Sequence, residues 1–351
     1  METGSEFWGL PLSEKENSFF PGGLRYTLSG RTALDMIAAD LRAERNAESI
    51  YMPAYCCDSM LEPFKRRGFK IRLYGVEPFP RELHRRVFSD HGCDAILLLD
   101  YFGFASEETA VLARAEKLRG TAVILDCVQS AFSQTEAVKY ADYSVYSFRK
   151  FFFSCAGAAK KHCGAWCVPE ANRQNGEYIS GRRRAAELKA AYIEKGEGEK
   201  SGFLRLFGEA EELLDEDFEG YAAEEKSLEE LRYADTELIV SRRRENAALL
   251  LKELRRLPAE LIRPLYAEIG ETDVPLFMPV LVKKELRQPL RQHLINNGVY
   301  CPVHWPSELG GADRLYDGEL SLVCDQRYGA EAMRREMTLI REFLEDNGYI
   351  L

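Results

Sequence analysis

The sequence predicts an α/β protein with a mostly parallel sheet. Short apolar runs alternate with longer amphipathic patterns through the first half of the chain, which is typical of βαβ units. Gly68 and Gly120 follow two of the expected helices, as glycine commonly does at a helix C-terminus. The chain of 351 residues is long enough for two domains. We expect a large domain over residues 1–240 and a smaller α/β domain over residues 241–351.

The first half of the chain supplies most of this sheet. A helix is expected over Arg31–Arg45, because five apolar residues repeat on one face: Ala33, Leu34, Ile37, Ala38 and Leu41. Glycine-terminated amphipathic patterns predict two more helices, over residues 58–67 and 107–118. Apolar runs predict strands over residues 49–52, 69–74, 95–99, 121–125 and 143–147, and the run Gly164–Val168 predicts a returning strand.

The second half begins with a strongly charged segment. The basic run Arg182–Arg184 precedes eleven acidic residues between Glu209 and Glu230, a pattern typical of a solvated helical face or a mobile connection. A helical pattern over Leu228–Leu254 is expected to bridge the domains. Strands over residues 274–282 and 299–303 and helices over residues 284–296 and 327–345 then suit the smaller domain.

Composition and charge exclude several classes of protein. A net charge of −10 argues against nucleic acid or an anionic membrane as the main partner. No apolar run approaches the roughly 20 residues that a membrane-spanning helix needs. The N-terminus lacks the basic start and apolar block of a signal peptide, so we expect a cytoplasmic protein.

The nine cysteines are scattered, as expected for reduced thiols. His162, Cys163 and Cys167 raise the alternative of a metal site. No second ligand pair follows them, and burial as small hydrophobic residues is the preferred interpretation.

An acid and a lysine at neighbouring strand ends carry the main chemical indication. Asp126 ends the strand over residues 121–125, and Lys150 follows the strand over residues 143–147. Pyridoxal phosphate chemistry needs this pair, because a lysine forms the Schiff base and a carboxylate keeps the pyridine nitrogen protonated. Phe148 and Phe151–Phe153 surround Lys150 with apolar groups, which would lower the pKa of its amine.

Other residues suit the same cofactor. Ser29–Ala33 opens the first helix, where free backbone N–H groups form an anion site for a phosphate, although a simple N-cap is the alternative. Gly30 permits close approach, and the hydroxyl of Thr32 adds a donor. Ser147 offers a second phosphate contact, and Gln129 could reach the ring hydroxyl. The Gly-Ala stretches at residues 156–158 and 164–165 would let the chain pass beneath a cofactor or make a plain hairpin turn.

In their order and spacing these motifs resemble the DegT-type branch of the fold-type-I pyridoxal phosphate aminotransferases, from about residue 25 to the end of the chain. The motifs that carry the resemblance are SGRTAL at Ser29–Leu34, the segment Tyr51–Val76, LDCVQS at Leu125–Ser130, SFRK at Ser147–Lys150, and the segments Val299–Pro306 and Leu320–Gly329.

The resemblance implies a fold-type-I α/β fold, a homodimer and ping-pong transfer of an amino group. The donor would be an amino acid, usually glutamate, and the acceptor a keto group, usually on a nucleotide-linked sugar. The resemblance implies that the cofactor's phosphate is bound by Ser147 and by the helix start, that is, by Gly30, Arg31, Thr32 and Ala33. It also implies that Asp126 contacts the pyridine nitrogen, that Gln129 contacts the ring oxygen and that Lys150 forms the Schiff base.

The sequence departs from the family pattern at several positions. Counting from Pro53 places Cys57 where the family has the ring that stacks on the cofactor, so Tyr55 and Tyr101 become candidates for stacking. The common family form has two more residues between serine and lysine, and Ser154–Ala158 replaces its Gly-Glu-Gly-Gly. The acidic segment occupies the region of the asparagine that reaches the partner subunit's site.

His304 and Arg327 are candidate substrate contacts, with a surface salt bridge as the alternative role of Arg327. Two other functions stay open. One is a lyase or dehydratase on the same scaffold, although the family's sugar dehydratases have histidine in place of the lysine. The other is a catalytically silent regulatory or assembly protein. The chain has no G-x-G-x-x-G after its first strand, no P-loop, no H-E-x-x-H and no G-x-S-x-G, which argues against those enzyme classes.

Overall fold

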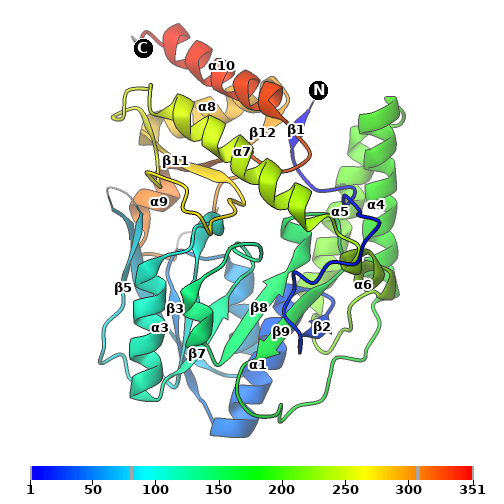
Figure 1. The fold of residues 1–351 in the computed structure, drawn as a ribbon, viewed down its shortest axis with the longest axis vertical. Coiled ribbons are helices and arrows are strands. Elements are labelled where there is room, and N and C mark those ends of the chain that lie inside the picture. Colours follow the sequence, from blue (N-terminus) through cyan, green and yellow to red (C-terminus); the bar gives the residue numbers. More distant parts are fainter. Residues whose placement is uncertain (1, 80–81, 306–308, 350–351) are drawn as a thin grey trace.

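The computed structural model describes residues 2–79, 82–305 and 309–349. Pro306, the last residue of one motif above, and the C-terminal residues 350–351 lie outside this range. The largest sheet has eight strands in the order β2-β9-β8-β7-β6-β3-β4-β5 (Figure 1). Its strands are β2 (Arg25–Thr27), β3 (Ser49–Pro53), β4 (Lys70–Pro78), β5 (Leu83–Arg86), β6 (Ala95–Leu99), β7 (Ala122–Asp126), β8 (Tyr143–Ser147) and β9 (Gly157–Lys161).

Five consecutive strands of this sheet, from β8 to β4, run parallel, and β9 and β5 pair antiparallel at the two sides. The predicted α/β class with a mostly parallel sheet is therefore confirmed. The helices are α1 (Gly30–Arg45), α2 (Glu62–Arg66), α3 (Glu107–Arg119), α4 (Gly176–Lys195), α5 (Lys200–Glu216), α6 (Glu225–Arg232), α7 (Thr236–Leu254), α8 (Lys284–Asn296), α9 (Asp313–Gly318) and α10 (Ala330–Asp346).

Both faces of the parallel sheet are buried, which explains why its strands are continuous apolar runs. In β6, Ala95 and Leu97 belong to the apolar cluster that α1 covers, whereas Ile96 and Leu98 belong to the cluster that includes Ala113 of α3. All five residues of β6 are buried. The alternation of side chains along each strand thus places helices on both faces and leaves the strand ends as the accessible edge.

A second sheet belongs to the C-terminal part of the chain. Its antiparallel strands β10 (Ile262–Pro264), β11 (Met278–Val282) and β13 (Glu319–Leu322) lie in the upper layer of Figure 1 with α7, α8 and α10. The N-terminal strand β1 (Thr3–Gly4) pairs in parallel with β12 (Val299–Tyr300), so the first residues of the chain lie beside its C-terminal part. The division into domains at residue 240 stays a prediction.

Three predicted elements are wrong. In place of one helix over residues 58–67, the chain forms a 3-10 turn at Asp58–Met60 and then the short helix α2. The returning strand is β9 at Gly157–Lys161, and Gly164–Val168 forms bends after it. Cys163 and Cys167 are exposed, contrary to the expected burial, because the chain has left the sheet by that point. The helix expected over Leu228–Leu254 divides into α6 and α7, since the carboxylate of Asp235 accepts the N–H of Leu238 at 3.0 Å and caps a new helix.

The charged segment is more ordered than its composition indicated. Helices α4 and α5 pack against each other as a hairpin beside the main sheet (Figure 1). Arg182 is 1% exposed and pairs with Glu6 and Glu211, while Arg183 pairs with Glu224 and Glu230. The basic and acidic runs therefore neutralise each other within the fold.

Other boundaries differ by a few residues: β11 begins at Met278, β12 ends at Tyr300 and α10 begins at Ala330. None of the helices in the described part of the chain combines the length and apolar content that crossing a bilayer requires.

Candidate active site

A cavity of about 440 Å³ lies at the carboxyl ends of the parallel strands, where the C-terminal part of the chain covers them. This volume falls within the range of about 300–1,000 Å³ that is usual for small-molecule sites. Its walls come from the ends of β7 and β8, the start of α1, the turn after β3, the helix α8, the segment after β12, and the N-terminal residues Gly4–Phe7. Open α/β sheets commonly bind ligands at this edge.

Asp126 and Lys150 both line this cavity, as predicted from their strand-end positions. The strands that carry them, β7 and β8, are neighbours in parallel register. Burial raises the pKa of Asp126 from 3.8 to about 7, although the N–H of Val128, which donates to it at 2.7 Å, and the charge of Lys150 act in the opposite direction. The carboxylate therefore lacks a cationic partner strong enough to offset its burial.

The side chain of Lys150 is exposed and lines the cavity, and the protein around it still desolvates its amine. This desolvation lowers the pKa of Lys150, and the positive charge of Arg149 lowers it further. The direction agrees with the sequence prediction. A lysine with a lowered pKa holds a larger share of the neutral, nucleophilic amine.

The start of α1 faces the same cavity through Gly30 and Arg31. Ser29 caps this helix, because its Oγ accepts the N–H of Thr32 at 3.1 Å. The first helical N–H groups have no acceptor within the helix, which makes this end suitable for an anion. Ser147 also lines the cavity, and a Cβ on Gly30 would lie 3.0 Å from the Cβ of Ser147 and 3.5 Å from its Oγ.

Gln129 and Cys57 line the cavity as well. The Oε1 of Gln129 accepts the N–H of Phe102 at 2.6 Å, so its amide nitrogen remains to donate to a ligand. The thiol of Cys57 lies 3.0 Å from the hydroxyl of Ser59.

Four predicted contacts are not brought to the cavity wall. Thr32 is 1% exposed, with its hydroxyl 3.1 Å from that of Ser29, and Ala33 is packed in the core beneath the helix. Tyr55 and Tyr101 are fully buried, and the hydroxyl of Tyr101 donates to the carbonyl of Tyr55 at 2.7 Å. The structure thus places neither ring for stacking on a ligand in this cavity.

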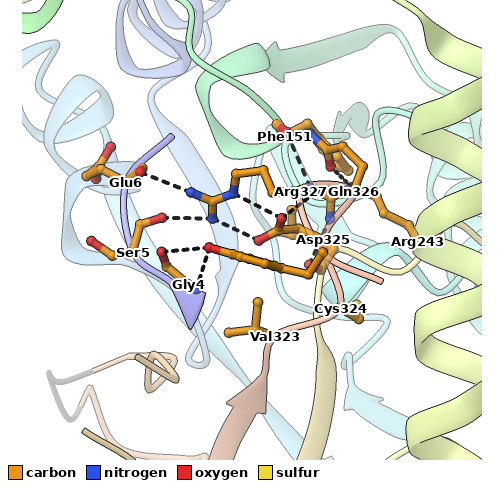
Figure 2. A network of polar contacts seen from close by, with 12 residues as sticks. Gly4, Ser5, Glu6, Phe151, Arg243, Val323, Cys324, Asp325, Gln326 and Arg327 are labelled. Carbon is orange, nitrogen blue, oxygen red and sulfur yellow. Dashed lines mark hydrogen bonds and ion pairs between the residues drawn. The ribbon is translucent and has the colours of Figure 1, made fainter. Parts of the chain in front are cut away.

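His304 and Arg327 line the cavity from the C-terminal part of the chain. The ring of His304 is held by the hydroxyl of Ser321 at 2.9 Å. Arg327 is already paired: its Nη2 lies 2.8 Å from Asp325, and the same guanidinium donates to the carbonyls of Ser5 and Glu6 at 3.0 and 3.1 Å (Figure 2). The ion pair with Asp325 is mostly buried, so it is not the surface salt bridge of the alternative prediction, and the substrate contact by Arg327 stays a prediction.

Arg327 fixes the N-terminal segment of the chain. Residues Thr3–Trp8, which we call the N-terminal strap, lie along the cavity, and Gly4, Ser5, Glu6 and Phe7 form part of its wall. The N–H of Gly4 donates to the hydroxyl of Tyr328 at 2.9 Å, and the amine of Lys189 donates to the carbonyl of Glu6. No local pattern in the first eight residues points to the side chains that hold them, which are more than 170 residues away in the sequence.

The strap also adds a charge beside Lys150. Glu6 accepts from Arg182 at 3.0 Å, Arg182 pairs with Glu211, and Glu211 pairs with Arg149. Burial alone would raise the pKa of Glu211, but Arg149 and Arg182 hold it at about 2. A chain of alternating charges therefore connects the strap to the residue next to Lys150.

Comparison with known proteins shows what this architecture resembles. No protein-family model matches the sequence, and no curated protein matches it either. Solved structures do match. Helicobacter pylori PseC, an aminotransferase involved in the biosynthesis of pseudoaminic acid, has a TM-score of 0.66 at 14% identity, covering 97% of this chain and 100% of that one. The chain has the fold of an aminotransferase.

Two further structures carry the same fold with relevant molecules bound. S. venezuelae DesV, in complex with a ketimine intermediate, has a TM-score of 0.62 at 16% identity over 93% of this chain and 86% of its own. Bacillus subtilis NtdA, with the cofactor PMP bound, has a TM-score of 0.63 at 17% identity over 92% of this chain and 73% of its own. These likenesses confirm the predicted fold-type-I architecture.

Proposed function

We propose that this protein is a pyridoxal phosphate-dependent aminotransferase that holds its cofactor covalently at the Nζ of Lys150. The observation that carries the proposal is the meeting of Lys150, Asp126 and the start of α1 in one cavity. An amine with a lowered pKa, a buried carboxylate without a strong cationic partner and an anion-binding helix start are the three groups that this cofactor requires.

The residues present fit the cofactor. Because Gly30 has no side chain, the start of α1 can lie close to Ser147: a Cβ on Gly30 would come within 3.0 Å of the Cβ of Ser147. The hydroxyl of Ser147 and the N–H groups of Gly30 and Arg31 would donate to that phosphate. Asp126 lies on the next strand and would meet the protonated ring nitrogen, which supplies the cationic partner that the carboxylate lacks.

The chemistry of each group follows from its environment. When bound, pyridoxal phosphate supplies an electron sink for the carbon that loses its proton. Lys150, released by the incoming amine, would take the proton from that carbon and return it at the next position, acting as general base and then general acid. Its lowered pKa keeps a larger share of the amine unprotonated near neutral pH. Asp126 would hold a proton at the ring nitrogen throughout.

The donor and the acceptor belong to the same proposal. Glutamate is the proposed amino donor, and a keto group on a nucleotide-linked sugar is the proposed acceptor. Support for the acceptor comes from the fold, which this chain shares with PseC and with a sugar aminotransferase from Micromonospora echinospora. A homodimer and a cytoplasmic location remain predictions that accompany this function.

The visible spectrum of the purified protein tests the proposal. Pyridoxal phosphate is added first, then L-glutamate, to the wild type, to Lys150→Ala and to the matched control Lys160→Ala, which changes a lysine outside the cavity wall. We expect an absorbance band of lysine-bound cofactor in the wild type and the control but not in Lys150→Ala. We also expect glutamate to convert it to the pyridoxamine form.

The other outcomes separate the rival functions. A band that forms but does not respond to any amino donor favours a lyase or dehydratase. Absence of a band in the wild type would refute the proposal and favour a silent regulatory relative. A band of equal strength in Lys150→Ala would show that the lysine assignment is wrong.

A further inference from the structure

The cationic side chains in the cavity wall are unevenly neutralised. Six of them line it: Arg31, Arg149, Lys150, Arg243, Arg291 and Arg327. Arg31 pairs with Asp215, Arg149 with Glu211 and Arg327 with Asp325. Lys150 is assigned to the cofactor by the proposed function. Arg243 and Arg291 have no ion pair with a carboxylate in the described part of the chain.

Arg243 is enclosed by acceptors of its own. Its guanidinium donates to the side chain of Gln326 at 2.8 Å and to the carbonyls of Pro275 and Leu276 at 3.2 and 2.9 Å. Its exposed fraction is 0%, so a ligand would have to displace these bonds to reach it. Arg243 therefore joins α7 to the loop before β11 and to the segment before α10, and it is not a ligand contact.

Arg291 has the opposite character. It projects from α8, is half-buried, and makes one hydrogen bond, from its Nε to the carbonyl of Cys301 at 3.2 Å. That bond fixes the side chain against the segment after β12. Its two terminal nitrogens, Nη1 and Nη2, have no acceptor among residues 2–79, 82–305 and 309–349. A guanidinium held at one nitrogen and open at the other two is arranged for a two-oxygen anion.

We infer that Arg291 is a specificity-determining residue that binds an oxyanion of the substrate through its two terminal nitrogens. This inference rests on the proposed function, because it assigns a substrate contact in the same cavity. Two sources share the required chemistry: a carboxylate of the amino donor, or the diphosphate of a nucleotide-linked acceptor.

The strap, on another part of the wall, adds a negative charge to the cavity, so the two parts of the wall differ in charge. Glu6 has one oxygen on Arg182, and no hydrogen bond to its other oxygen is seen within the described residues. Its side chain is 44% exposed, and it belongs to the cavity wall. A carboxylate here repels an anion and accepts hydrogen bonds from hydroxyl or ammonium groups. The anionic end of a substrate would therefore lie toward Arg291, and hydroxyl or amino groups toward Glu6.

Anion binding by matched variants tests the inference. The variants are Arg291→Gln, Arg291→Lys and the control Arg287→Gln, which removes a charge one turn earlier on α8 from a residue outside the cavity wall. Glutarate and uridine diphosphate are titrated calorimetrically at low salt, each into protein without cofactor and into protein loaded with pyridoxal phosphate. Thermal unfolding verifies that each variant is folded.

We expect Arg291→Gln to weaken at least one probe by about 10- to 100-fold, as loss of a two-point charged hydrogen bond does. Arg291→Lys should restore part of the affinity, and Arg287→Gln should change it less than about twofold. An effect on glutarate alone assigns the donor's carboxylate, and an effect on uridine diphosphate alone assigns the acceptor's phosphates.

Equal binding of both probes by the wild type and Arg291→Gln would overturn the inference, as would absence of binding by the wild type. Failure of the proposed function is visible separately. In that case no lysine-bound cofactor band forms in the wild type, whereas the titrations without cofactor still report on Arg291.

Discussion

Replacing Gly157 with alanine tests how the sheet supports the candidate phosphate site. Gly157 opens β9, and its position beneath the start of α1 leaves no space for a side chain. A Cβ there would lie 2.4 Å from the carbonyl carbon of Ser29, 2.6 Å from its oxygen and 2.6 Å from the nitrogen of Gly30. All three atoms belong to the backbone, so no side chain can rotate to relieve the contact.

The size of the effect follows from these distances. Real Cβ contacts essentially never fall below 3.0 Å, so the backbone of Ser29 and Gly30 must move by about 0.6 Å. Overpacking of this kind costs about 1–3 kcal/mol of unfolding free energy. The same movement displaces the first helical N–H groups, and we expect the dissociation constant for pyridoxal phosphate to rise at least about tenfold.

The assay pairs urea denaturation with a spectral titration of the cofactor. Gly181→Ala is the matched control, because its Cβ would meet only the Cβ of Ala210, at 3.9 Å, in the middle of α4. That substitution should raise the unfolding free energy by about 0.5–1 kcal/mol, since alanine favours helix. If Gly157→Ala unfolds at the wild-type urea midpoint and binds the cofactor equally well, the reasoning is wrong.

The remaining predictions concern the charges of the cavity. Because burial places the pKa of Asp126 at about 7, its ionised form is lost below that pH, and affinity for pyridoxal phosphate should fall by up to tenfold per pH unit. Asp126→Asn should bind the cofactor weakly, with little dependence of its affinity on pH. Spectral titrations between pH 5 and 8, about the range in which this group titrates, measure both affinities. Parallel pH curves for the wild type and Asp126→Asn would contradict the prediction. Without cofactor, the native state holds this proton from about pH 4 to about pH 7 while the unfolded state has lost it, so the free energy of unfolding should decrease across that interval. Arg327→Gln should release the strap, and hydrogen exchange at residues 3–8 should become at least tenfold faster; unchanged exchange there would mean that other contacts hold the strap.

The central sheet could be predicted because its signals are local. A buried strand such as Ala95–Leu99 is a continuous apolar run, and Gly120 closes α3 in the left-handed conformation that glycine favours. Asp126 and Lys150 were found for the same reason, since each lies at the end of such a strand. Parallel neighbours then bring their carboxyl ends together at one edge.

The parts of the cavity wall that come from segments distant in the sequence could not be predicted in this way. The strap has no apolar period and is fixed by Arg327, Tyr328 and Lys189. The returning strand was predicted at Gly164–Val168 because that run is apolar. The strand instead forms at β9, where Gly157 has no side chain and can lie against the backbone of Ser29. Arg243 did leave a signal: it occupies a buried position on the same face of α7 as Ile239, Ala247 and Leu250, where an apolar residue would be expected.

The contrast between Arg149 and Lys150 explains why the acidic segment matters to the site. The two residues are adjacent and carry the same charge, but Arg149 is neutralised by Glu211 of α5, whereas Lys150 has no ion pair with a carboxylate in the part of the chain that the structure describes. Without Glu211, an unpaired guanidinium would remain next to the amine and disfavour its protonated form further, since Glu211 itself raises the pKa of Lys150. The α4–α5 hairpin thus affects the pKa of Lys150 directly through Glu211, which also pairs with Arg149. A segment whose composition indicated a solvated surface contributes one carboxylate to the charges around Lys150.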